Sequence, residues 1–159
     1  MLSFAALQLD VGNVGMSGPR SQPMSSAANQ VATRAYFEKL WNRGDLTIID
    51  AIMVPEIKFH YPLGDLFGAD ALKQYVGTVR AAFPDIRFAI TELFGDEDRV
   101  AVRWSLSGTQ TGSFKGRPPS GVAVNVQGIT VVHLTHGKIH EMRVSFDPSR
   151  LVGHRPDSK

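Results

Sequence analysis

The clearest pattern in the chain is a helical one, in residues 68–84. Apolar side chains recur there at offsets of 0, 3, 4, 7 and 11 residues, which places them on one face of an α-helix. This face consists of Leu72, Tyr75, Val76, Val79 and Phe83. Pro84 ends the predicted helix, because proline cannot continue one.

Two more helices are predicted nearer the N-terminus. Apolar residues at helical spacing predict a helix that begins at Asn29 as its N-cap and stops at Gly44. Residues 45–54 predict a second, short helix that ends at Pro55. Residues 56–63 then predict a short strand.

After Pro84 the period of the pattern changes from helical spacing to two. Four long strands are predicted, at residues 86–94, 98–110, 121–134 and 137–147, with a turn at the start of the last. Helices followed by an antiparallel meander are typical of the α+β class. A curved sheet with helices packed over its concave face makes a half-open cone, and we expect that cone to enclose a pocket.

Composition narrows the possible partners and chemistry. The chain has 159 residues, enough for one domain, and 43% hydrophobic and 20% charged residues indicate a globular protein. Its net charge is only +2 and its basic residues are scattered, so we expect no nucleic-acid partner. The absence of cysteine excludes disulfides, thiolate catalysis and Cys-zinc sites. His133, His136 and His140 lack a carboxylate or thiol to complete a metal site, so we expect surface residues and no metal.

Both ends of the chain are predicted to lie outside the folded domain. Residues 11–28 are rich in Gly, Ser, Pro and Met without a period, so we expect a disordered leader at 1–28, a domain at 29–153 and a flexible tail at 154–159. No basic segment precedes the apolar run at the N-terminus, which argues against a signal peptide. No window reaches the length of a membrane span, so we expect a cytoplasmic protein without a membrane partner.

The strands also predict a partner chain. In residues 100–104 and 129–134 apolar residues occur on both faces of the predicted sheet. A sheet that is apolar on both sides needs a cover on each face, so we expect a homodimer formed through the outer face.

Asp147 ends the last predicted strand and allows two interpretations. An aspartate followed by Pro148 is a typical N-cap with proline at the first helical position. Alternatively, a carboxylate in an apolar pocket has a raised pKa and can act as a general acid and base. Side chains alternate along a strand, so if Asp147 points into the cone, Arg143 and Ser145 do as well. Arg143 would then hold an anionic or carbonyl group of a ligand, or pair with a carboxylate.

The order of the elements and several motifs resemble the SnoaL-like polyketide cyclases of the NTF2-like superfamily. The motifs are YFEKLWNRGDL, FHYPLG, FPDIRF, DRVAVRW, GTQTGSFKGRPPSG and GKIHEMRVSFD. The resemblance covers residues 31–153 and implies a cone that closes a ring by intramolecular aldol condensation, with neither metal nor cofactor. The family's aspartate, the acid/base of that reaction, matches Asp147, and the histidine of its first strand matches His60. Relatives commonly have Trp at the position of Arg143 and His at that of Gln110.

We therefore expect a cofactor-free cyclase or isomerase that acts on a hydrophobic, carbonyl-bearing small molecule. Asp147 is its predicted acid/base, and His60 or Gln110 its donor to the enolate. His60 could equally line the pocket or be a hydrogen-bonded core residue. The residues expected to contact the substrate are Arg143, Ser145, Gln110, Trp104, Tyr36 and Trp41, although aromatic residues at these spacings are more often core.

Two alternatives remain open at this stage. Epoxide opening on the same fold needs a carboxylate-activated water and a second acid, and about 13 Å of strand between Arg143 and Asp147 argues against it. A non-catalytic ligand-binding or dimerisation module is favoured if the Asp147 carboxylate faces solvent rather than a closed apolar cavity. The loop at residues 112–121 could gate the cavity, but a plain connection is the favoured interpretation.

Overall fold

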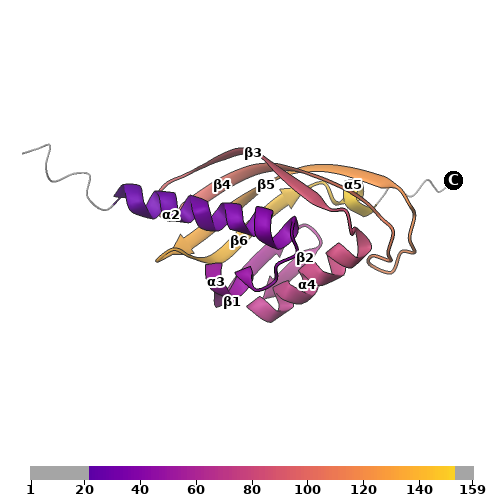
Figure 1. The fold of residues 1–159 in the computed structure, drawn as a ribbon, viewed down its shortest axis with the longest axis horizontal. Coiled ribbons are helices and arrows are strands. Elements are labelled where there is room, and N and C mark those ends of the chain that lie inside the picture. The colour runs from indigo at the N-terminus through magenta and orange to yellow at the C-terminus, as the bar shows by residue number, and fades with distance from the viewer. Residues whose placement is uncertain (1–21, 153–159) are drawn as a thin grey trace, which may run out of the picture.

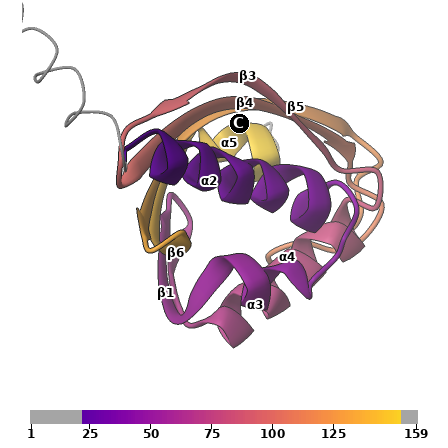
Figure 2. The ribbon, with the colours of Figure 1, turned by 60° about the vertical axis from the view of Figure 1, so that its left-hand side comes forward.

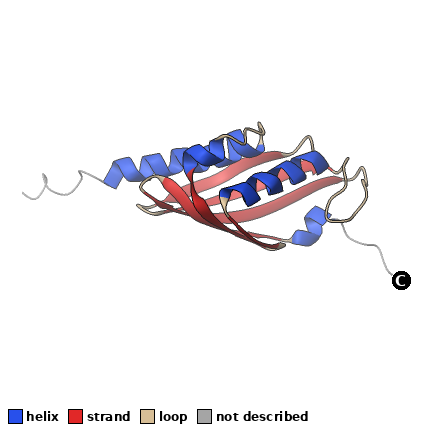
Figure 3. Ribbon diagram, turned by 90° about the horizontal axis from the view of Figure 1, so that it is seen from below, coloured by secondary structure: helices blue, strands red, loops and turns tan. Residues whose placement is uncertain are grey.

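The sheet of this protein is curved and open, and it carries all the helices on one side (Figures 1 and 3). The computed structural model describes residues 22–152. Its six strands lie in the order β2-β1-β6-β5-β4-β3. Their bounds are β1 Met53–Tyr61, β2 Gly64–Phe67, β3 Arg87–Gly95, β4 Arg99–Thr109, β5 Ala123–Thr135 and β6 Lys138–Phe146. Neighbouring strands are antiparallel except β1 and β6, which are parallel, so the predicted antiparallel sheet is mixed at one pair.

The helices fill the hollow of the sheet (Figure 2). They are α2 Gln22–Ala35, the π-helical turn η1 Tyr36–Trp41, α3 Ile48–Ile52, α4 Ala69–Ala82 and α5 Pro148–Val152. This arrangement confirms the predicted α+β class with helices over the concave face.

The two strongest sequence patterns correspond to two surfaces that are buried in the structure. Helix α4 buries Leu72, Val76 and Val79 at helical spacing, as predicted. Strand β4 alternates between buried and accessible residues along its whole length, with Val102 and Trp104 among the buried ones. These side chains meet in one core between the helices and the sheet.

The first helix begins earlier than predicted. Helix α2 begins at Gln22, so Asn29 is not its N-cap. Asn29 is instead buried within the helix, where its side-chain amide donates to the backbone carbonyl of Glu97 at 2.8 Å. Of the leader predicted at 1–28, residues 22–28 belong to α2, and the rest of it, like the tail predicted at 154–159, lies outside the described residues.

Two short elements also differ from the prediction. Helix α3 ends at Ile52 and β1 begins at Met53, so Pro55 lies inside a strand rather than at a helix end. The register between β1 and β6 shifts between Met53 and Lys58, which is the type of irregularity that accommodates proline in a sheet. Strand β2, which follows Pro62, was not predicted.

Candidate functional site

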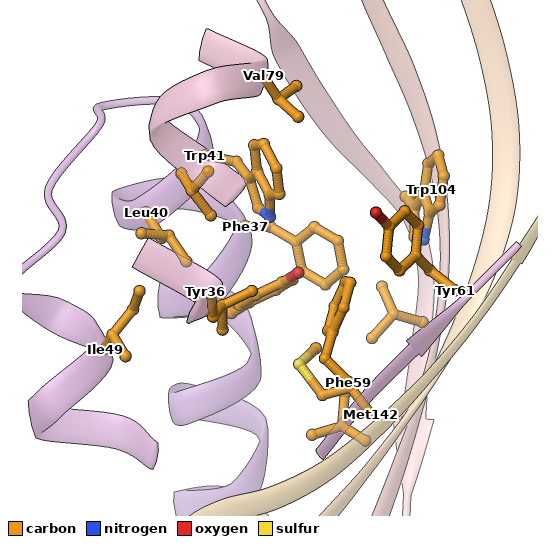
Figure 4. Close-up of a cluster of buried hydrophobic side chains, with 14 of the residues drawn as sticks. Tyr36, Phe37, Leu40, Trp41, Ile49, Phe59, Tyr61, Val79, Trp104 and Met142 are labelled. Atoms are coloured by element: carbon orange, nitrogen blue, oxygen red, sulfur yellow. The ribbon is translucent and has the colours of Figure 1, made fainter. Parts of the chain in front are cut away.

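The core of the cone leaves a cavity that is lined mainly by aromatic rings (Figure 4). Nine of its fifteen lining residues are aromatic: Tyr36, Phe37, Trp41, Phe59, Tyr61, Tyr75, Phe88, Trp104 and Phe146. The cavity volume is about 40 Å³, which at roughly 10–15 Å³ per water molecule holds about three waters. A ligand the size of an aromatic ring therefore requires lining side chains to change rotamer.

The turn η1 supplies three of these rings. Its widened geometry is fixed by a hydrogen bond from the backbone N–H of Asn42 to the carbonyl of Phe37, five residues earlier. A regular α-helix would place Tyr36 and Trp41 on different faces, whereas the π-turn allows both to line the cavity. The side chain of Asn42 then joins this turn to β3, because its amide exchanges two hydrogen bonds with the backbone of Phe88 at 2.7 and 2.9 Å.

The polar groups of the cavity are neutral donors. Burial raises the pKa of Tyr36, and the nearby Trp41 indole offsets part of that rise. Burial also raises the pKa of Tyr75 well above its usual value, with further contributions from Tyr61, to which it is hydrogen-bonded, and from Tyr36. The hydroxyls of Tyr36 and Tyr75 therefore stay protonated at neutral pH.

The two indoles of the cavity differ in their hydrogen bonding. The N–H of Trp104 donates to the hydroxyl of Thr130 at 2.9 Å. The N–H of Trp41 is buried, lies near Tyr36, and has no hydrogen-bond acceptor in proper geometry among the described residues. A buried polar group without a partner is uncommon, and it marks the place where an acceptor on a ligand would be stabilised.

Asp147 lies outside this cavity and caps α5. Its Oδ1 accepts hydrogen bonds from the backbone N–H of Ser149 at 3.0 Å and from the Ser149 hydroxyl at 2.8 Å, with Pro148 at the first helical position. The N-cap interpretation is therefore confirmed. The carboxylate is exposed and does not line the cavity, although Phe146 before it and Leu151 after it do.

The prediction that Arg143 and Ser145 on β6 point into the cone is wrong. Val144 and Phe146 line the cavity, so the alternation of the strand turns Arg143 and Ser145 to the outer, exposed face. Arg143 pairs there with Glu141, at 3.1 Å between Nη2 and Oε2. Neither residue reaches the cavity in which a substrate contact was predicted.

The predicted position of His60 is wrong for the same reason. Phe59 and Tyr61 line the cavity, so His60, between them, faces outward. Its Nδ1 lies 3.2 Å from Oδ1 of Asp65, and its Nε2 lies 3.0 Å from Oε2 of Glu141. His60 is therefore part of an ionic network on the outer face and does not line the cavity in which it was predicted to act.

Gln110 has a structural role in the loop between β4 and β5. Its buried amide nitrogen donates to the carbonyls of Gly112 and Pro118 at 3.1 and 3.2 Å, and its Oε1 accepts from Ser120 Oγ at 3.1 Å. These bonds occupy the side chain that was predicted to donate to a substrate. Gln110 does not line the cavity.

Tyr36, Trp41 and Trp104, which were predicted to contact the substrate, all line the cavity. Sequence reasoning missed Phe59 and Tyr61, although their alternation with His60 was a usable signal. No Asp, Glu, His, Lys or Arg side chain of the described residues lines the cavity. The ammonium group of Lys115 approaches from the loop, 3.5 Å from the Tyr61 hydroxyl.

Within residues 22–152 there is neither a cluster of metal ligands nor a membrane-spanning helix. There, His, Cys, Asp and Glu form no group of three or more suited to a metal ion. The rings of His133 and His140 lie 6.2 Å apart on neighbouring strands. None of the helices described is both long and apolar enough to cross a membrane.

Comparison with known proteins gives a family match over nearly the whole described chain. The model of the SnoaL-like polyketide cyclases matches residues 30–152. A candidate SnoaL-like polyketide cyclase from Jannaschia sp. CCS1 is similar in structure, with a TM-score of 0.75 and 24% identity, over 80% of this chain and 90% of that one. The candidate polyketide cyclase IdmH from Streptomyces antibioticus has a TM-score of 0.68 and 22% identity, over 78% and 95% of the two chains.

A third similar structure is TerC, which was co-crystallised with polyporic acid. Its TM-score is 0.65 at 20% identity, over 79% of this chain and 95% of that one. At these identities the solved structures establish the fold alone. The comparison with curated proteins found no match.

Proposed function

This chain belongs to the SnoaL-like polyketide cyclase family, and we propose that it binds an aromatic, carbonyl-bearing small molecule in the cavity of the cone without a cofactor. The observation that carries this proposal is the buried Trp41 N–H, for which residues 22–152 offer no acceptor in proper geometry, in a cavity lined by nine aromatic residues. Stacked rings suit a flat apolar ligand, and the indole N–H suits one carbonyl oxygen on it.

The same donors also suit chemistry beside a carbonyl. Proton loss next to a carbonyl places negative charge on the oxygen, and fixed donors in a dry site stabilise that charge. The Trp41 N–H and the protonated Tyr36 hydroxyl are such donors. Epoxide opening gains no support, because no carboxylate or histidine of the described residues lines the cavity.

Intrinsic tryptophan fluorescence tests the binding proposal directly, because both tryptophans of the chain line the cavity. We expect 2-naphthamide, an aromatic ring with one carbonyl group, to change this fluorescence saturably. The variant Trp41→Phe, read through Trp104, should weaken the binding of 2-naphthamide by about 2- to 10-fold, the loss of one neutral hydrogen bond. Naphthalene has no acceptor, so its affinity should stay the same. Absence of saturable binding in the parent protein would refute the proposal.

Acid/base catalysis by Asp147 is a second candidate function. The observation in its favour is position: Phe146 and Leu151, on either side of it in the chain, both line the cavity. A ligand that projects from the cavity past these two residues would meet the Asp147 carboxylate. This candidate keeps the predicted role of Asp147 but places the reacting atoms of the ligand outside the cavity rather than inside it.

The variant Asp147→Asn separates capping from catalysis. Asparagine caps a helix about as well as aspartate, so the free energy of unfolding should change little, but an amide cannot shuttle a proton. Exchange of the methyl protons of 2-acetonaphthone into deuterium oxide, followed by NMR, reports proton abstraction beside a carbonyl. We expect exchange catalysed by the parent protein to fall by roughly 10² to 10⁴ in the variant. Asp147→Ser, which also caps, is the control for folding, and equal exchange in all three proteins would eliminate Asp147 as the base.

A further inference from the structure

The loop between β4 and β5 holds a lysine against the cavity, and we propose that Lys115 recognises an anionic group on the ligand, a carboxylate or an enolate. This inference rests on the proposed function and deepens it, because it names the charge of the ligand. It starts from one contact: the Nζ of Lys115 lies 3.5 Å from the hydroxyl of Tyr61 and 5.9 Å from the centre of its ring. Tyr61 lines the cavity and is buried.

The backbone of the loop places this lysine at a specific point. Phe114 and Arg117 exchange two backbone hydrogen bonds of 2.9 Å, which closes a tight turn with Lys115 and Gly116 at its tip. Both tip residues have positive φ, 52° at Lys115 and 76° at Gly116. Turns of this kind prefer Asn or Gly at the first tip position, so lysine there is conformationally unfavourable. A costly conformation at a non-glycine residue is typical of functional sites.

The turn is anchored on both sides rather than free to move. The buried ring of Phe114 packs edge-on against Phe83 at the end of α4, with ring centres 5.6 Å apart. The side chain of Gln110 ties together the two ends of the same loop, as described above. The ammonium group of Lys115 is therefore presented to Tyr61 by a loop that is fixed to the core.

The charges around the cavity favour a ligand that carries an acidic group. Lys115 is exposed, and no carboxylate in residues 22–152 forms a salt bridge with it. No cationic side chain of residues 22–152 lines the cavity, so its neutral donors can hydrogen-bond to an anionic ligand but supply no opposite charge. A ligand whose ring lies among the aromatic residues, and whose acidic group points to Tyr61, would place that group beside the ammonium. A charge-assisted hydrogen bond of this kind is roughly twice as strong as a neutral one.

A matched pair of ligands tests this inference. 2-Naphthoate and 2-naphthamide have nearly the same shape and differ in charge, and tryptophan fluorescence reports both. We expect the parent protein to bind 2-naphthoate about tenfold more tightly than 2-naphthamide at low salt, and the variant Lys115→Gln to lose this preference while it keeps its affinity for 2-naphthamide. Glutamine has no greater tolerance of positive φ than lysine, so the cost of the turn stays matched.

The control variant is Lys58→Gln, which removes an exposed lysine from the same strand as Tyr61, on the opposite side of the sheet. It should leave the preference for the anion unchanged. In the parent protein, added salt should weaken the binding of 2-naphthoate and leave that of 2-naphthamide unaffected. Equal affinities for the two ligands, or a preference that survives in Lys115→Gln, would overturn the role of Lys115 while the proposed function stands. Failure of 2-naphthamide to bind at all would overturn the proposed function and this inference with it.

Discussion

At the scale of single residues, the pKa of Glu141 is set more by its hydrogen-bonded and charged neighbours than by its burial. Burial on its own would raise the pKa of this half-buried carboxyl group. The hydrogen bond from His60 and electrostatic interactions with Arg143, His133 and His60 together lower it below its usual value. The ionised form of Glu141 is thus favoured in the folded protein relative to the unfolded chain.

This preference predicts a pH dependence of stability in the acid range. A carboxyl group with a lowered folded pKa stabilises the protein fully above its unfolded value of about 4.3, and this contribution is lost as the pH falls through the folded value. We expect Glu141→Gln to reduce the loss of thermal stability between about pH 5 and pH 3. The control is Glu38→Gln in η1, whose exposed carboxylate forms a 4.0 Å pair with Arg34 that is solvated on both sides. Identical pH profiles of the parent protein and Glu141→Gln would contradict this account.

The residue scale is also where sequence reasoning failed most clearly. The alternation along β6 was correct, but it does not say which of the two faces points inward. Asp147 suggests that its own face points inward, whereas Met142, Val144 and Phe146 form the apolar face of the strand and are packed in or against the core. A polar residue with a suggestive position in the sequence was given more weight than the hydrophobic face beside it.

At the scale of elements, the long periodic segments were predictable and the irregular ones were not. Helix α4 and strands β3 to β6 follow from their hydrophobic patterns. Burial of one face fixes the spacing of the apolar residues, and in a strand it also fixes the register with its neighbours. The π-turn at Tyr36–Trp41 depends on one shifted hydrogen-bond register, which leaves no mark in the pattern of apolar residues. The tight turn at Lys115 is equally hidden, since lysine is not a residue that a turn of this kind favours.

Gly128 on β5 gives a prediction at this scale. A Cβ atom there would lie 2.4 Å from Cζ2 of Trp104 and 2.8 Å from the carbonyl oxygen of Ser145, so the indole ring would have to move. We expect Gly128→Ala to lower the free energy of unfolding by about 1–3 kcal/mol, as overpacking does, and to weaken the binding of 2-naphthamide in the same cavity. Chemical denaturation measures the first effect.

The matched control is Gly77 in α4, where an added Cβ atom meets nothing within 4 Å. Gly77→Ala should raise the free energy of unfolding by about 0.5–1 kcal/mol, because alanine is the better helix former. If both substitutions changed stability in the same direction, the close approach of Gly128 to Trp104 would not be the cause.

At the scale of the whole molecule, the outer face of the sheet is more polar than the sequence pattern indicated. His60, Glu141 and Arg143 form an ionic network there, and Arg103 lies 3.5 Å from Glu92 on the neighbouring strand. Three large apolar residues of that face are exposed among the described residues: Phe67 on β2 at 63%, Phe94 on β3 at 65% and Ile129 on β5 at 49%. A homodimer through this face stays a prediction, and any such interface would combine a small apolar centre with charged surroundings.

The position of Ile129 allows the dimer prediction to be tested with one substitution. Ile129 lies opposite Arg103 on β4 and opposite Ser145 on β6, so it occupies the middle of the outer face. We expect sedimentation velocity at micromolar concentration to show a dimer, and Ile129→Glu to convert it to a monomer, because a carboxylate at the centre of an interface is desolvated without a partner.

The control is Val31→Glu on α2, where an apolar side chain with 68% exposure lies on the helical side of the sheet. Since Ile129 faces away from the cavity, the monomeric variant should still bind 2-naphthamide. A parent protein that sediments only as a monomer would show instead that this polar outer face is an ordinary solvated surface, and that the cone binds its ligand without a partner.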